Sequence, residues 1–257
     1  MISALRSAKL KLIRASEHIK AIERCIRGYR RRKPYKLIGD PHSETTLDIR
    51  KPPPEDIAIL AGEVLYQLRS ALDHLAFDLV KLNRTGIVLP HTWEEDCNFP
   101  LRFKFPKGVT KPPVAQKHFT DALPGITKSA FAFIESVQPY YRTGTPEIMG
   151  WLAHLSNIDK HRHLNLTVTN VTHREVLRLN RGWTSHARSG LQHGAKIKSP
   201  FTKPEQRMNV KSTVSAYVTF KEVSIGKASD VAVEYLLQLF SNTIEAEIIP
   251  AFDQFLN

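Results

Sequence analysis

The sequence predicts a mainly helical α+β protein, a helical bundle with a small antiparallel β insertion before the C-terminal helix. Long segments near both ends carry apolar residues at helical spacing. Between them, from about 161 to 227, apolar and polar residues alternate as they do in strands. Because 257 residues are enough for one large core, we expect a single domain with its bundle formed by 1–160 and 228–257.

Two long helices are expected in the first third of the chain, at about 4–29 and 55–82. In the first, apolar residues recur every seven positions, which is typical of a narrow apolar seam on a long helix. In the second, they are spaced by threes and fours, which is the strongest helical pattern in the sequence. Between the two, Gly39 and Asp40 separate two short β-like runs and predict a small hairpin, and the triple proline 52–54 forbids a helix.

The remaining elements follow the same kind of pattern. Two further helices are expected near 112–138 and 146–160, and the closing helix from about 229 to 255. The stretches "LNLTVTNV" and "TVSAYVTFKEVSI" alternate like strands, and the glycine-rich, basic segment between them is predicted to be a loop or hairpin. This order of elements favours a helical bundle that carries a small sheet.

The charge balance favours a polyanionic partner. Thirty-seven Lys and Arg against 25 Asp and Glu give a net charge of +12, and nucleic acid is the commonest polyanion in a cell. Cys25 and Cys97 lie far apart and outside any CxxC pattern, which argues for a reducing compartment and against a thiolate zinc site. Since we find neither a membrane-spanning run nor the apolar centre of a signal peptide, we expect a cytoplasmic protein that does not enter a membrane.

Arg69 and His74 are a polar pair on the second predicted helix. Five helical steps place their side chains about 140° apart with a rise of about 7.5 Å. Asp78 lies one turn after His74 and can orient its imidazole, while Asp73 lies one turn after Arg69 and can pair with it. Histidine exchanges protons near neutral pH and arginine binds phosphate oxygens, as metal-independent RNA cleavage requires. Alternatively, the Arg69–Asp73 and His74–Asp78 pairs are structural polar pairs without a catalytic role.

The spacing Arg-x-x-x-x-His on a central helix resembles the HEPN superfamily, many of whose members are metal-independent ribonucleases or toxins. The resemblance implies an RNA substrate, no cofactor, and a homodimer whose cleft brings Arg69 and His74 together. Arg69 would stabilise the phosphate charge, His74 would act as general acid or base, and Asp78 would orient His74. An antitoxin-like protein partner is a further expectation. The strings "GEVLYQLRSALDHL" and "NIDKHR" are also similar to a bacterial family of uncharacterised function, which implies no activity.

A second cluster, "HLSNIDKHRHLNL", lies where the fourth predicted helix gives way to a strand, and three interpretations of it stay open. Lys160, His161 and Arg162 would line the catalytic cleft and contact phosphate. Alternatively, Asp159 and His161 would bind a divalent metal ion together with His74. In the third interpretation, the cluster only ends the helix and its basic side chains are solvated.

The β insertion offers further contacts to nucleic acid, because Arg178 and Arg181 can bind phosphate and Trp183 can stack on a base. The leading prediction is therefore an RNA-binding, metal-independent endoribonuclease. The first alternative is a non-catalytic module that binds nucleic acid or a protein, and the second is a metal-dependent hydrolase. Convergence of Arg69 and His74 in an open cleft would favour the ribonuclease. Three converging metal ligands would favour the metal-dependent hydrolase.

Overall fold

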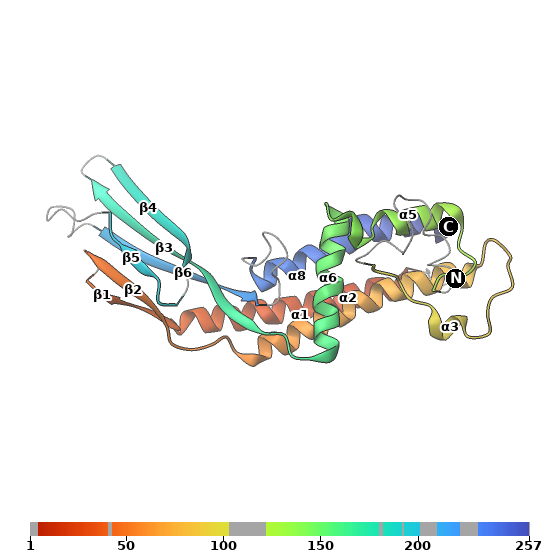
Figure 1. Ribbon diagram of the computed structural model, residues 1–257, viewed down its shortest axis with the longest axis horizontal. Coiled ribbons are helices and arrows are strands. Elements are labelled where there is room, and N and C mark those ends of the chain that lie inside the picture. Colours follow the sequence, from red (N-terminus) through yellow and green to blue (C-terminus); the bar gives the residue numbers. More distant parts are fainter. Residues whose placement is uncertain are drawn as a thin grey trace. The chain divides into compact units, whose positions relative to one another are not determined.

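The computed structural model describes residues 5–40, 43–102, 122–179, 182–191, 193–200, 210–221 and 231–256. The predicted class, a mainly helical α+β protein with small antiparallel sheets, is confirmed (Figure 1). The chain divides into two compact units. Their segments are Met1–Ala21, Ile59–His163 and Glu234–Asn257 in the first unit, and Ile22–Ala58 and Leu164–Val233 in the second.

Helices dominate the described part of the chain. The long ones are α1 (Arg6–Arg31), α2 (Glu55–Leu82) and α6 (Thr145–His161). The shorter ones are α3 (Trp93–Asp96), α5 (Lys128–Ser136), the 3₁₀ turn η1 (Pro139–Tyr141), α8 (Val233–Thr243), the π-helical turn η3 (Ile244–Ile248) and α9 (Ile249–Leu256). None of the described helices combines the length and apolarity that crossing a bilayer requires.

The apolar patterns of α1 and α2 become the core. The seven-residue seam of α1 is buried along its length. On α2, Leu68, Leu72 and Leu75 are fully buried, and each such side chain contributes about 2 kcal/mol by leaving water. Contacts of Ser7 with His74 and of His18 with Glu63 show that α1 and α2 are antiparallel neighbours in the first unit.

The second unit contains two three-stranded antiparallel sheets. One has the order β1 (Tyr35–Gly39), β2 (Glu44–Ile49) and β5 (Lys196–Lys198), and the other has the order β4 (Gly182–Leu191), β3 (Leu166–Leu179) and β6 (Val210–Phe220). The predicted hairpin at Gly39 is β1–β2, and the backbone of Gly39 has a φ of +122°, which favours glycine. β5 of the β insertion is therefore the third strand of the sheet that contains the β1–β2 hairpin, and this hairpin precedes α2 in the sequence.

The helix expected at 112–138 and the closing helix differ from the structure in their bounds. Residues 112–121 lie outside the described residues. Residues 122–127, which include the helix-interrupting sequence "ALPGI", are turns or irregular, so the described helix is α5, which begins after Thr127. The Thr127 hydroxyl accepts a hydrogen bond from the Ala130 N–H and caps this helix. The closing helix begins at Val233 instead of 229 and passes through the π-helical turn at Ile244–Ile248.

Candidate functional site

Arg69 lies on α2 with a side chain that is only 17% exposed. Its Nη2 atom donates a hydrogen bond to the Phe99 carbonyl oxygen at 3.1 Å and lies 3.6 Å from Asp73 Oδ1. Burial lowers the pKa of Arg69, and the negative charge of Asp73 opposes that effect. The Nη2 atom of the guanidinium is therefore engaged inside the first unit, while Nη1 is buried and has no hydrogen-bond partner among the described residues.

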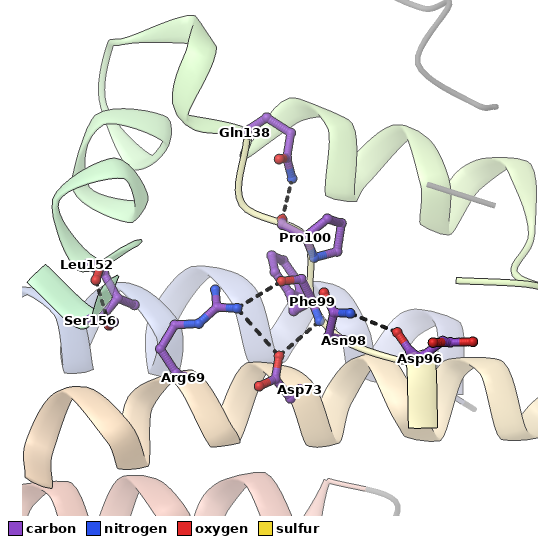
Figure 2. A network of polar contacts seen from close by, with 9 residues as sticks. All are labelled: Arg69, Asp73, Asp96, Asn98, Phe99, Pro100, Gln138, Leu152 and Ser156. Carbon is purple, nitrogen blue, oxygen red and sulfur yellow. Dashed lines mark hydrogen bonds and ion pairs between the residues drawn. The ribbon is translucent and has the colours of Figure 1, made fainter. Parts of the chain in front are cut away.

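Asp73 and Arg69 together hold both backbone polar groups of Phe99. The Asp73 Oδ1 atom accepts a hydrogen bond from the Phe99 N–H at 3.0 Å, and the next residue is held by Gln138, whose Nε2 donates to the Pro100 carbonyl at 2.9 Å (Figure 2). Since Phe99 is fully buried, these bonds replace water at groups that solvent does not reach. We call Arg69, Asp73 and the Phe99 backbone the Phe99 clamp.

His74 faces a different element. Its Nδ1 atom is hydrogen-bonded to the Ser7 hydroxyl of α1. One turn further on, burial raises the pKa of Asp78, and the positive charges of His74 and Lys81 oppose that effect. The orientation of His74 by Asp78 stays a prediction. Arg69 contacts the Phe99 segment and His74 contacts α1, so this chain does not by itself bring Arg69 and His74 together.

A cleft of about 810 Å³ in the first unit is lined by α1, α2 and the C-terminal end of α6, and we call it the α1–α2–α6 cleft. Its charged and imidazole side chains are Arg14, His18, Glu63, Asp159, His161, Arg162 and His163. The cleft thus holds two guanidinium groups, two carboxylates and three imidazoles. Of the residues predicted to bind nucleic acid, His161 and Arg162 line it, whereas the exposed Lys160 does not.

The two strings singled out in the sequence meet in this cleft. Gly62 and Glu63 begin the first string, and Asp159 belongs to the second. A Cβ atom at position 62 would lie 2.8 Å from the Asp159 carboxyl carbon, so only glycine lets this carboxylate approach the backbone of α2. Burial raises the pKa of Asp159, and the charge of His163 opposes that effect.

His18 and Glu63 form the best-defined polar pair of the cleft. His18 Nδ1 lies 3.1 Å from Glu63 Oε2, with the His18 side chain 13% exposed and the Glu63 side chain 48% exposed. A carboxylate at Nδ1 fixes the orientation of the ring and leaves Nε2 for proton exchange with a ligand. Arg14, His18 and Glu63 are not among the residues predicted from the sequence. Glu63 belongs to the string "GEVLYQLRSALDHL", but only the packing of α1 against α2 connects it to His18.

The residues predicted in the β insertion belong to the second unit. Arg178 of β3 and Trp183 of β4 are direct partners in the antiparallel register, so the backbone places these two residues side by side. Arg181 lies outside the described residues. The cleft and this strand pair are therefore separate candidates for contact with nucleic acid.

The metal-binding interpretation needs His74, Asp159 and His161 to meet. Asp159 and His161 line the cleft, whereas His74 contacts Ser7. In the described part of the chain, no group of three histidine, cysteine, aspartate or glutamate side chains is placed to hold a metal ion. The cleft nevertheless contains the side-chain types that acid–base chemistry on a phosphate ester requires.

No family model, no curated protein and no solved structure matches this chain. The resemblance of Arg69 and His74 to the HEPN motif therefore stays a prediction.

Proposed function

We propose that this chain binds RNA in the α1–α2–α6 cleft and cleaves it without a metal ion. The His18–Glu63 pair carries the proposal, because His18 lines the cleft and a carboxylate at Nδ1 leaves Nε2 as the ring nitrogen that can exchange a proton with a substrate. The net charge of +12 supports a polyanionic substrate. An RNA strand supplies its own nucleophile, the 2′-hydroxyl, so the cleft needs to provide only proton transfer and positive charge.

The proposed reaction assigns one imidazole to each proton transfer. His18 removes the proton of the 2′-hydroxyl, whose oxygen attacks the adjacent phosphorus. The bond from phosphorus to the 5′ oxygen breaks, and the leaving oxygen takes a proton from His163, which lines the same cleft as His18. The products are a 2′,3′-cyclic phosphate and a 5′-hydroxyl, with no net change in protons.

Arg162 and Arg14 are assigned to the phosphate. Arg162 caps the C-terminus of α6, is exposed, and makes no ion pair with any described residue. Arg14 pairs with Glu17 at 2.7 Å, but both side chains are more than half exposed, and such surface pairs are worth only about 0–1 kcal/mol. Either guanidinium is therefore available to bind two phosphate oxygens and the charge that develops on them.

Arg69 takes a different role in this proposal. Its guanidinium holds Phe99 and is assigned as a structural group, while His74 and Asp78 are assigned to the packing of α1 against α2. The homodimer and the antitoxin-like partner stay predictions of the HEPN resemblance.

The test is a ribonuclease assay on pooled small RNAs with excess chelator. Wild type is compared with His18→Asn, Glu63→Gln and Arg162→Ala, and folding of each variant is checked by circular dichroism. We expect cleavage by wild type that ends in 2′,3′-cyclic phosphates, and a loss of about 100-fold or more in His18→Asn. His154→Asn is the matched control, because His154 is a half-buried histidine of α6 outside the cleft.

Two further variants separate the candidates. If Arg69→Ala and His74→Ala abolish cleavage while His18→Asn leaves it intact, the reaction belongs to the HEPN-like pair and not to the cleft. If the folded wild type binds RNA and leaves it uncut, the non-catalytic binding module replaces the enzyme.

A further inference from the structure

We infer that the α1–α2–α6 cleft takes single-stranded RNA and that Tyr66 is the platform on which one base stacks. The inference rests on the proposed function, since it names the form of the RNA and a residue that selects it.

Tyr66 is a large aromatic side chain left in solvent beside the charged groups of the cleft. It lines the cleft and is 61% exposed. A tyrosine ring that packs in the core gains free energy by burial, which this ring forgoes. The Nζ atom of Lys11 lies 5.6 Å from the ring centroid, so a cation occupies one side of the ring and favours a fixed orientation. The ring is thus pre-positioned and largely uncovered.

Ile59 extends the apolar surface along the same face of α2. It is 55% exposed, lines the same cleft, and precedes Tyr66 by seven residues, which is almost two helical turns or about 10.5 Å. Glu63, the partner of His18, stands between them on this face. The cleft therefore combines apolar surface for bases and cations for phosphates with the imidazole proposed to act on the backbone.

This arrangement favours a single strand over a duplex. In a duplex each base is covered by its neighbours and its faces are closed to a protein ring. In a single strand the faces are accessible, and stacking on an aromatic side chain is worth roughly 1–3 kcal/mol per base. Binding by charge alone would not need Tyr66, so the dependence on the ring separates base stacking from general attraction to polyanions.

The test measures binding of a labelled oligonucleotide of about 12 nucleotides, long enough for one such site. Its riboses carry 2′-O-methyl groups, which remove the nucleophile and prevent cleavage. Fluorescence anisotropy gives the affinity of the full-length wild type for the single strand, for its duplex and for an abasic strand with the same phosphates. Tyr66→Ala and Tyr66→Phe are compared with Tyr235→Ala, which removes a tyrosine that is 64% exposed on α8 and lies outside the cleft.

We expect Tyr66→Ala to weaken single-strand binding about 10-fold and to leave abasic-strand binding unchanged. Tyr66→Phe should keep the wild-type affinity, because the ring stays, and Tyr235→Ala should have no effect. Equal losses in Tyr66→Ala and Tyr235→Ala, equal affinity for strand and duplex, or an unchanged Tyr66→Ala would each overturn the inference. These binding results do not depend on cleavage. If the wild type cuts RNA but Tyr66→Ala binds the single strand with the wild-type affinity, the role of Tyr66 as a platform is refuted and the proposed function is kept. Absence of any RNA binding would refute both.

Discussion

Replacing Arg69 with alanine should destabilise the first unit substantially, because it opens the Phe99 clamp. The charge-assisted hydrogen bond to the Phe99 carbonyl is worth about 1.5–3 kcal/mol. The ion pair with Asp73 adds at most about 1 kcal/mol, because Asp73 is 37% exposed and water can solvate its carboxylate when Arg69 is absent. Loss of the methylene groups of Arg69, whose side chain is only 17% exposed, adds about 1 kcal/mol. We therefore expect a loss of about 3 kcal/mol.

The assay is thermal and urea unfolding, together with hydrogen exchange of the Phe99 amide. A loss of 3 kcal/mol lowers the Tm by roughly 6–12 °C in a chain of this size. Asp73→Ala should speed exchange of the Phe99 amide because it removes the acceptor of that N–H. The double variant should be less destabilised than the sum of the single ones by at least about 0.5 kcal/mol, since both side chains hold one residue.

The matched control is Arg27→Ala. Arg27 and Glu23 form an ion pair with the same spacing of four residues, but the Arg27 side chain is 60% exposed, so the loss should stay within about 0.5 kcal/mol. If Arg69→Ala costs no more than Arg27→Ala and leaves exchange at Phe99 unchanged, the clamp does not stabilise the fold and the structural assignment of Arg69 is wrong.

Three further predictions concern Gly62 and Asp159 in the cleft and Cys97 near Asp73. Gly62→Ala should move the Asp159 carboxylate away from α2, because a Cβ atom at position 62 would lie 2.8 Å from its carboxyl carbon, and Gly62→Ala combined with Asp159→Ala should melt at a higher temperature than Gly62→Ala alone. Cys97 should react more slowly with iodoacetamide at about pH 8 in the folded chain than after unfolding in urea, as followed by mass spectrometry, because burial and the charge of Asp73 raise its pKa to about 12. Asp159→Asn should raise the Tm near neutral pH and have a smaller effect at about pH 3. Burial raises the pKa of Asp159 in the folded state. The contribution of this carboxyl group to stability is therefore present in acid and is lost as pH rises through that pKa.

Local pattern was enough to predict α2 and most of α1. The apolar spacing and the prolines before Glu55 predict the observed bounds of α2. In α1, Gly28 and the basic run after it predict an earlier end than the observed Arg31. The last predicted residue, Tyr29, is buried at the next position of the seam, and its hydroxyl donates to the Lys51 carbonyl at 2.6 Å. Packing of Tyr29 in the second unit thus stabilises this end of α1 beside Gly28 and the basic run, which locally oppose a helix.

Contacts between distant segments were beyond the reach of such patterns. The pairing of Thr45 with Ile197 joins β2 to β5 across most of the chain, and nothing in either short run specifies its partner. The same holds for His18 and Glu63, since each reads as a polar residue on its own helix until the register of α1 against α2 is known. The two strings around Gly62 and Asp159 were visible, but their meeting required the position of α6.

Helical geometry gives a last way to separate the two catalytic assignments. Residues five positions apart diverge by about 140°, and Arg69 and His74 indeed contact different elements, so they would form one site only with a second copy of the chain. The cleft assembles His18, Glu63 and Arg162 from a single chain. Cleavage in the cleft should therefore have a rate per chain that does not change on dilution, with the oligomeric state followed in parallel by light scattering. A rate per chain that falls as dimers dissociate would instead place the reaction at the shared Arg69–His74 site.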